Sequence, residues 1–207
     1  MHLEALTNTA KELLPYLKNF SDYYLSGGTA LALQIGHRVS LDFDFFSDNQ
    51  IPKTLYTQVK KVLRGNANTR LVVNNSSELT IFANDIKVTF LYYPFPLINS
   101  LVTLKGLKLP TVKELAAIKA YTIGRRGEYK YYIDLYFLLN EEHTSLVEIL
   151  KIARKKYKND FNDRLFLEQL IYLDDVNEYE VRLLKQDSIT KEKLKNFFEE
   201  EVKNLRL

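Results

Sequence analysis

Two acidic residues, Asp42 and Asp44, are separated by one residue in the segment SLDFDFFS, a spacing that suggests metal chemistry. The segment alternates at its centre, which predicts a strand. Alternate side chains leave the same face, so the carboxylates should converge while Leu41, Phe43 and Phe45 point into the core. Paired carboxylates suit Mg²⁺, and two such ions can support phosphoryl transfer. Taken alone, the pair has a simpler explanation: a half-exposed strand with two acids on its solvent-facing side.

A glycine pair, Gly27-Gly28, stands between an expected strand at 23–26 and an expected helix at 29–36. Glycines let the backbone approach a ligand closely, and the helix N-terminus offers free N–H groups to a phosphate. The Thr29 hydroxyl can add a contact. A tight turn that requires positive φ is the simpler explanation. The segment lacks the further glycines, or the Gly-Lys pair, of the dinucleotide and P-loop motifs.

The order strand, Gly-Gly turn, helix and Asp-x-Asp strand is that of the active-site unit of DNA polymerase β-like nucleotidyltransferases. Residues 25–47, LSGGTALALQIGHRVSLDFDFFS, closely resemble the signature of the AbiEii/AbiGii-type nucleotidyltransferase family. That family includes toxins of bacterial type IV toxin–antitoxin and abortive-infection systems. The similarity continues in residues 86–96, 114–139 and 170–176, and therefore touches most of the chain.

The resemblance implies a role for each matching residue. Gly27 and Gly28 would hold the nucleotide phosphates, with the Ser40 hydroxyl placed just before the metal pair. Asp42 and Asp44 would bind Mg²⁺, with Mn²⁺ as an alternative. Lys119 would contact the nucleotide triphosphate, and Asp134 would assist catalysis. Arg38 lies just before the strand that carries the acid pair. Its guanidinium can pair with a phosphate, or it can cap the C-terminal end of the preceding helix.

Simpler explanations exist for the two helical residues. Lys119 lies in an apolar helix and can extend to solvent along its own stem. Asp134 stands four residues after Lys130, the spacing of a surface ion pair. Against this, Asp134 has Ile133 and Leu135 as neighbours, an unfavourable setting for a charge with no function.

Two positions depart from the family pattern. Tyr131 follows Lys130 where the family commonly has an acidic residue. Thr89 occupies the place where many polymerase β-like enzymes supply a third carboxylate. The first departure removes one acid of the family pattern, and the second bears on a second metal site.

The segment KIARKKYK, residues 151–158, is the densest basic run in the chain. Cationic side chains next to an aromatic ring can bind an RNA backbone, although a solvated helix face is the more common role. The side chains concerned are Arg154, Lys155, Lys156, Tyr157 and Lys158.

Periodicity predicts an α+β protein: a polymerase β-like core, with a mixed sheet and flanking helices, followed by a C-terminal helical bundle. The expected domains are a nucleotidyltransferase core at 1–110 and a packed helical region at 111–207. Strands are expected at 23–26, 40–47, 70–74, 78–83 and 86–93, with a tight turn at Asn84-Asp85. Helices are expected at 3–20, 29–36, 53–64, 111–123, 128–139, 145–158, 163–172 and 190–205.

Composition excludes several classes of protein. The chain has 207 residues, is 46% hydrophobic and carries a net charge of +3, so it can bury a core and need not bind nucleic acid. It contains no cysteine, which rules out disulfides, thiolate nucleophiles and Cys-based zinc sites. It also shows no secretory signal and no apolar run long enough to span a membrane. We therefore expect a soluble, cytoplasmic protein.

These patterns predict a Mg²⁺-dependent enzyme that transfers a nucleoside monophosphate from an NTP to an acceptor hydroxyl. By family analogy, the expected acceptor is tRNA, the expected role is that of a toxin, and the expected partner is a cognate antitoxin. Two alternatives stay open. One is a nucleotidyltransferase that modifies a small molecule or a protein. The other is a non-catalytic nucleotide-binding module of the same fold.

Overall fold

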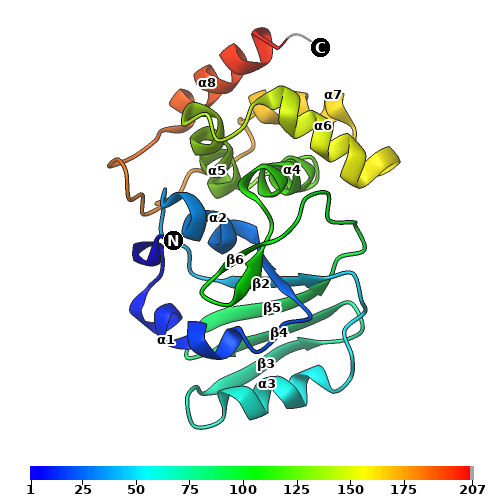
Figure 1. Ribbon diagram of the computed structural model, residues 1–207. Coiled ribbons are helices and arrows are strands. Elements are labelled where there is room, and N and C mark those ends of the chain that lie inside the picture. Colours follow the sequence, from blue (N-terminus) through cyan, green and yellow to red (C-terminus); the bar gives the residue numbers. More distant parts are fainter. Residues whose placement is uncertain (206–207) are drawn as a thin grey trace. The chain divides into compact units, whose positions relative to one another are not determined.

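A computed structural model describes residues 1–205 (Figure 1). They form two compact units. The first comprises Met1–Pro96 and Ser100–Pro110, and the second comprises Leu97–Asn99 and the chain from Thr111 onward. A mixed sheet with flanking helices occupies the first unit and helices occupy the second, which confirms the expected α+β fold class.

A mixed five-stranded sheet in the order β1-β2-β5-β4-β3 organises the first unit. β2 and β5 pair in parallel, whereas the β1–β2, β4–β5 and β3–β4 pairs are antiparallel. The strands are β1 (Tyr24–Ser26), β2 (Phe43–Ser47), β3 (Thr69–Asn74), β4 (Glu78–Ala83), β5 (Ile86–Tyr92) and a separate hairpin of β6 (Val102–Leu104) and β7 (Leu107–Leu109). The helices are a 3₁₀ turn (Leu3–Ala5), α1 (Asn8–Leu17), α2 (Gly27–Ile35) and α3 (Leu55–Leu63).

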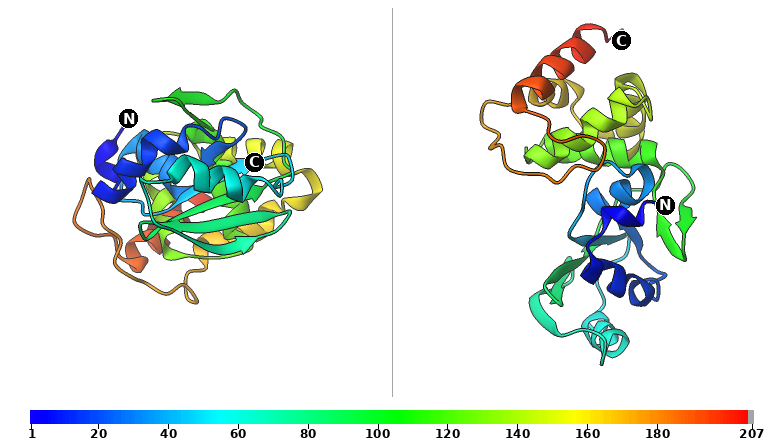
Figure 2. Two further views of the ribbon diagram at one scale, coloured as in Figure 1. Left: turned by 90° about the horizontal axis from the view of Figure 1, so that it is seen from below. Right: turned by 90° about the vertical axis from the view of Figure 1, so that its left-hand side faces the viewer.

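One face of this sheet is packed against apolar side chains. Helices α1 and α3 lie on the same side of the sheet (Figure 2). The Phe20 and Tyr23 rings, which follow α1, meet Phe90 of β5 edge-on, and Phe45 of β2 stacks on the same ring. Alternation along β2 therefore places Asp44 on the opposite face. Leu41, expected in the core, is instead 58% exposed, because β2 begins only at Phe43.

Local signals explain several boundaries. Pro15 lies inside α1 and does not end it. Asn84 and Asp85 have φ values of 47° and 64°, which is the geometry of a two-residue hairpin turn, so the expected turn between β4 and β5 is confirmed. Gly36 ends α2 in the left-handed conformation, with a φ of 65°.

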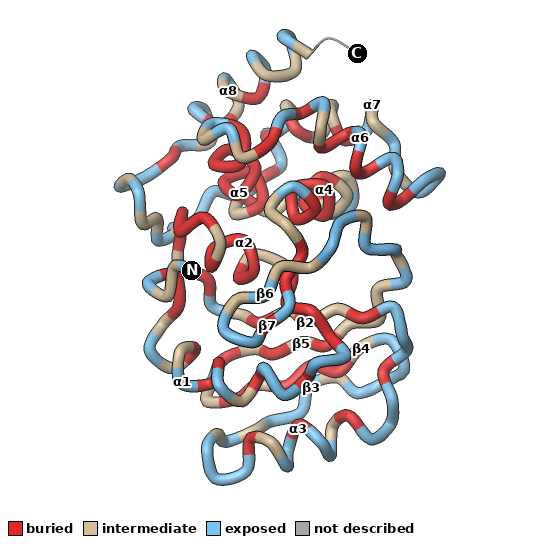
Figure 3. The backbone as a smooth tube through the Cα atoms, viewed as in Figure 1, coloured by how far each residue is buried: buried red, intermediate tan, exposed pale blue. Residues whose placement is uncertain are grey.

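The second unit is built from helices with polar N-caps. These helices are α4 (Val112–Ile123), α5 (Tyr129–Asn140), α6 (Leu146–Tyr157), α7 (Asp163–Ile171) and α8 (Lys191–Lys203), with a 3₁₀ turn at Lys158–Asp160. Side chains of Thr111, Ser145, Asn162 and Thr190 accept hydrogen bonds from the first turns of α4, α6, α7 and α8. Helices α4 and α5 are mostly buried (Figure 3). Within residues 1–205, none of the helices has the length and apolar composition needed to cross a bilayer.

Candidate active site

The glycine bend lies directly against the second acid of the pair. β1 ends at Ser26, α2 begins at Gly27, and Gly27 has a φ of 65°, which an L-residue adopts only with strain. A Cβ at Gly27 would stand 2.6 Å from Asp44 Oδ2. Ser26 and Asp44 are also register partners across β1 and β2. The bend and this carboxylate therefore share one location, and only glycine fits at position 27.

A buried cation stands beside the second glycine. A Cβ at Gly28 would collide with the Arg38 guanidinium and lie 3.6 Å from Ser40 Oγ. Arg38 is 5% exposed, and its Nη1 donates to the Val39 carbonyl oxygen at 3.1 Å. The first N–H groups of α2 carry partial positive charge at the same place. Guanidinium and helix N-terminus together form an environment that favours an anion.

The Thr29 hydroxyl connects α2 to the chain that leads into β2. It lies 2.8 Å from Ser40 Oγ and donates to the main-chain carbonyl oxygen of Asp42. Since a hydroxyl has a single proton, Thr29 then accepts from Ser40. These bonds fix the backbone next to the acid pair. The nucleotide contacts expected of Thr29 and Ser40 stay predictions.

Asp42 lies one residue before β2 and has a cation as neighbour. Its Oδ2 is 3.5 Å from Lys87 Nζ, with the two side chains 38% and 41% exposed. Lys87 precedes Thr89 by two residues in β5, and Thr89 is the register partner of Asp44. Lys87 was not predicted as a site residue, although the alternation of IKVTF places it on the same face as Thr89.

A row of hydroxyl groups continues from Asp44 across the sheet. Thr89 pairs with Thr80 of β4, and their Oγ1 atoms are 3.2 Å apart. Thr80 Oγ1 is also 2.6 Å from Glu78 Oε1. A carboxylate can only accept, so Thr80 donates to Glu78 and Thr89 donates to Thr80. The Thr89 oxygen can still accept a hydrogen bond at the position where many polymerase β-like enzymes supply a third carboxylate. The negative charge of Glu78 is connected to Thr89 through the Thr80 hydroxyl. Glu78 and Thr80 were likewise not predicted from the sequence.

The donor set is suited to a metal that retains other ligands. Among residues 1–205, no group of three or more His, Cys, Asp or Glu side chains is placed to hold a metal ion. Asp42 and Asp44 nevertheless supply hard oxygens on one face, next to a bend suited to phosphate. Mg²⁺ is commonly held by one or two carboxylates together with water and substrate phosphates. The residues present therefore fit Mg²⁺ bound with a nucleotide.

In the helical unit, Lys119 of α4 and Asp134 of α5 form a buried ion pair. Lys119 Nζ is 2.5 Å from Asp134 Oδ2, and the side chains are 5% and 0% exposed. Lys130 does not form the expected i,i+4 ion pair with Asp134, because its Nζ is paired with Glu128 Oε2 at 3.0 Å. Lys119 does not extend to solvent either. Burying two charges costs free energy unless they are well paired, so both groups can be buried here only because they are in close contact. The catalytic roles of Lys119 and Asp134 stay predictions.

Tyr131 covers this ion pair with its ring. Lys119 Nζ lies 4.7 Å from the ring centroid, a cation–π distance. The Tyr131 hydroxyl receives a hydrogen bond from Arg126 and donates to Glu128 Oε1 at 3.2 Å. Burial, followed by the charge of Glu128, raises the pKa of Tyr131. A neutral aromatic face therefore stands where the family commonly has an acid.

The basic run is only partly exposed, which corrects one expectation. Arg154, Lys155 and Lys158 are exposed, but Lys156 is buried and its Nζ is 2.8 Å from Glu114 Oε1. Burial lowers the pKa of Lys156, and Glu114 acts in the opposite direction. Glu114 also accepts from two backbone N–H groups of segment 97–99 at 3.0 Å. Lys156 therefore stabilises the helical unit and is not available to RNA.

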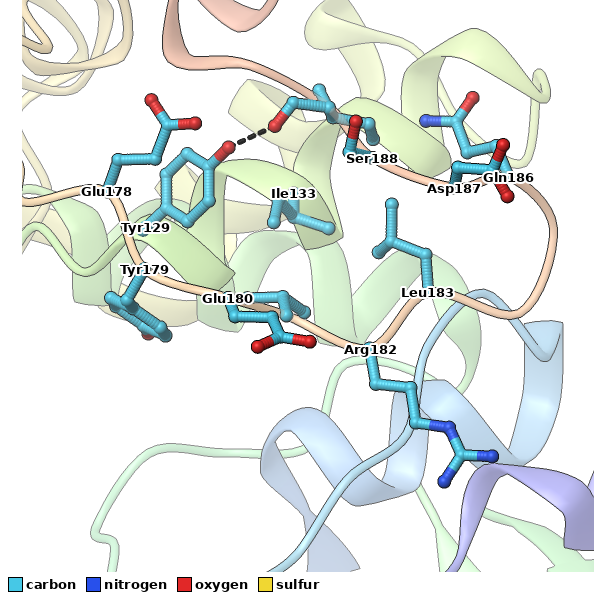
Figure 4. Close-up of a pocket in the computed structure, with 12 residues that line it drawn as sticks. Tyr129, Ile133, Glu178, Tyr179, Glu180, Arg182, Leu183, Gln186, Asp187 and Ser188 are labelled. Carbon is cyan, nitrogen blue, oxygen red and sulfur yellow. Dashed lines mark hydrogen bonds between the residues drawn. The ribbon is translucent and has the colours of Figure 1, made fainter.

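The helical unit also contains a cavity of about 280 Å³ between α5 and the segment 178–189 (Figure 4). The Tyr129 hydroxyl donates to the Ile189 carbonyl oxygen, which fixes the segment on the helix. Burial, followed by the charge of Glu178, raises the pKa of Tyr129 to about 12. Arg182 extends away from Tyr129 and Ile133 in this view. The cavity contains none of the residues expected to act in catalysis.

The chain is similar in sequence and in fold to known proteins. Residues 12–205 match the family described as "Nucleotidyl transferase AbiEii toxin, Type IV TA system". An uncharacterized Aquifex aeolicus protein, aq_aa25, is 34% identical over 168 residues, which cover 76% of this chain and 77% of that protein. A Helicobacter pylori protein described as a candidate nucleotidyltransferase has a similar fold, with a TM-score of 0.58 and 22% identity over 95% of this chain and 94% of its own. JHP933 from H. pylori gives a TM-score of 0.52 and 19% identity over 78% and 87% of the two chains.

Proposed function

Because the chain belongs to the AbiEii nucleotidyl transferase toxin family of type IV toxin–antitoxin systems, we propose that it transfers a nucleoside monophosphate from an NTP to an RNA hydroxyl, with Mg²⁺ bound at Asp42 and Asp44. The proposed acceptor is tRNA, the proposed consequence is growth arrest, and a cognate antitoxin is the proposed partner. The observation that carries the proposal is the close approach of Gly27 to Asp44: a Cβ at position 27 would stand 2.6 Å from Asp44 Oδ2. It supports phosphate binding next to the metal-binding carboxylates.

The proposed reaction is an in-line displacement at phosphorus. The acceptor oxygen forms a bond to the α-phosphorus, the bond from that phosphorus to the bridging oxygen breaks, and pyrophosphate leaves with the electron pair. The acceptor hydroxyl gives up its proton to solvent water. When bound, Mg²⁺ neutralises phosphate charge and aligns the reacting oxygens.

The residues of the first unit have distinct tasks in this reaction. The first N–H groups of α2 and the Arg38 guanidinium bind phosphate oxygens. Asp42 and Asp44 orient the metal-bound nucleotide, and Thr29 keeps their backbone in place through the Asp42 carbonyl. Lys87 balances the charge of Asp42 before metal and nucleotide arrive. Charges fixed in advance in this way stabilise a transition state without reorganisation.

The helical unit adds the Lys119–Asp134 pair. On the family pattern, Lys119 contacts the triphosphate, and Asp134 holds the Lys119 ammonium group in position through the 2.5 Å contact.

The test is transfer of label from NTPs with an α-³²P group to separate pools of tRNA, protein and small molecules, with pyrophosphate release measured in parallel. We expect labelled tRNA from the native chain and at least a hundredfold loss in Asp42→Asn and Asp44→Asn. Asp48→Asn removes an exposed acid just after β2 and serves as the matched control. Native far-UV circular dichroism of each variant shows that folding is retained.

Two other outcomes would replace the proposal. Label confined to protein or small molecules would assign a different acceptor. NTP and Mg²⁺ binding without pyrophosphate release, across all three pools, would indicate a binding module. Thr89 and Tyr131, which stand where related enzymes commonly have acids, give that second outcome a basis.

A further inference from the structure

A second cavity in the helical unit combines an aromatic wall with an immobilised arginine. Its volume is about 240 Å³, and its lining includes Tyr121, Arg125, Phe161, Leu165 and Phe166. The residues come from α4, the turn after it, the segment between the second 3₁₀ turn and α7, and the start of α7. None of them belongs to the glycine bend, the acid pair or the Lys119–Asp134 pair. The cavity is therefore a distinct feature of the helical unit.

Arg125 is held flat at this cavity. Its guanidinium carbon is 3.5 Å from the Tyr121 ring centroid, and Tyr121 in turn stacks on Tyr157 at 3.8 Å with an interplanar angle of 9°. Nη1 donates to the Tyr121 carbonyl oxygen at 3.3 Å and Nη2 to the Asp160 carbonyl oxygen at 3.0 Å. An exposed arginine normally loses rotamer entropy on binding. Here the stack and the two carbonyls have already fixed it.

The other wall of the cavity is apolar and reaches the surface. The rings of Phe161 and Phe166 are 5.9 Å apart, and Leu165 is 42% exposed. The chain bends into this wall at Lys158, whose φ of 51° is uncommon for a residue with a side chain. Such strain persists where the surrounding structure requires it, often at binding sites. The wall therefore forms a hydrophobic slot beside the planar guanidinium of Arg125.

Arg125 and Asp160 line the cavity, and further charged side chains lie nearby in the sequence. Arg154 and Arg164 are balanced by Asp163 and Glu168, at 2.8 Å and 2.7 Å. Among the described residues, neither Lys155 nor Lys158, both exposed, takes part in an ion pair. Lys158 lies two residues before Asp160, so its ammonium group can meet a flexible polyanion whose planar group enters the slot. Aromatic and arginine faces beside lysines are the features with which proteins hold unpaired nucleotides.

We infer that this cavity binds an unpaired base of single-stranded RNA, with the base extending the Tyr157–Tyr121–Arg125 stack and a neighbouring phosphate meeting Lys158. A duplex cannot use the slot, because its bases are already stacked on one another. The inference rests on the proposed function in its choice of RNA as the polyanion. It assigns to the helical unit an acceptor-binding task that needs neither NTP nor metal.

Fluorescence anisotropy of a labelled single-stranded RNA tests this directly. The protein is the full chain carrying Asp44→Asn, assayed without NTP or metal, so loss of transferase chemistry cannot affect the result. Arg125→Ala should weaken binding about tenfold or more, as expected for one lost stacking partner. Arg125→Lys keeps the charge but loses the plane, and should weaken binding by a similar factor. Arg182→Ala removes the same charge elsewhere in the unit and should change the affinity less than twofold.

Two further measurements separate insertion of a base from simple charge attraction. Leu165→Lys adds a cation at an exposed position where folding is not at risk. It should weaken binding if a base enters the slot, and strengthen it if only charge matters. Lys158→Ala should reduce the slope of log affinity against log salt by about 0.7, the value for one phosphate contact with a single strand. Equal affinities of the Arg125→Ala and Arg182→Ala proteins, or a duplex that binds as tightly as the single strand, would overturn the inference.

Discussion

Replacing Gly27 by alanine tests whether the glycine bend and Asp44 work as one unit. Two effects follow from the structure. The φ of 65° costs an L-residue about 1–2 kcal/mol. The new Cβ would also lie 2.6 Å from Asp44 Oδ2, whereas ordinary contact begins at 3.4 Å, so the carboxylate must retreat by about 0.8 Å. Misplacement of a reacting group by about 1 Å can reduce the rate about a hundredfold.

Gly65 provides the matched control. Its φ is 76°, and a Cβ there would meet nothing within 4 Å. Gly65→Ala therefore carries the backbone cost without displacing a carboxylate. Urea unfolding followed by circular dichroism should show a loss of about 1–2 kcal/mol from φ alone in both variants. Only Gly27→Ala should lose metal affinity, measured by Mn²⁺ titration, and about a hundredfold in pyrophosphate release.

The comparison has a clear refuting result. If Gly27→Ala retains the metal affinity and turnover of Gly65→Ala, Asp44 does not depend on the bend, and the reasoning from close approach fails. If Gly65→Ala loses as much activity as Gly27→Ala, the effect comes from general destabilisation. Neither result depends on the identity of the acceptor.

Three further predictions concern single interactions. Lys156→Met leaves Glu114 charged and buried, so it should cost about 3–5 kcal/mol of unfolding free energy; adding Glu114→Gln should recover part of this loss in urea titrations, and a mild single variant would contradict the argument. Glu78→Gln should weaken Mn²⁺ binding about tenfold or more through Thr80 and Thr89, as calorimetry can measure, and unchanged affinity would show that the hydroxyl row does not reach the metal. Burial raises the pKa of Glu141, but Lys185 and His143 outweigh it and lower the pKa below the ordinary value of 4.5, so its stabilising effect should be present above that pH and lost as the pH falls through the folded-state pKa. Unfolding of Lys185→Met should therefore depend less on pH in the acid range, and an unchanged pH profile would show that this contact contributes little.

Much of the fold could be predicted from local patterns. The alternation of β2, the Asn84-Asp85 turn and the apolar periodicity of the C-terminal helices are properties of neighbouring residues, and the structure shows each of them. The hairpin of β6 and β7 gave no comparable signal, because each strand has only three residues. The position of Leu41 was wrong for a related reason: periodicity alone does not show where a strand begins.

Long-range pairing explains what sequence reasoning missed at the site. Lys87 and Glu78 belong to the site because the strand register places β5 beside β2 and β4 beside β5. The same holds for Lys156, which follows the pattern of a solvated basic run but is paired with Glu114, 42 residues away in sequence. A charged residue that becomes buried carries a desolvation cost. Tertiary packing determines which partner offsets that cost.

By itself, the sequence determined the chemical groups available: two alternating acids, a glycine bend before a helix, and a lysine and an aspartate in apolar helices. These follow from residue type and short spacing, because backbone geometry is local. Only the tertiary structure decided that Gly27 touches Asp44, that Lys119 pairs with Asp134 rather than meeting solvent, and that Arg125 lies flat at a cavity. Those outcomes depend on distances between segments far apart in the chain, which are set by strand register and helix packing.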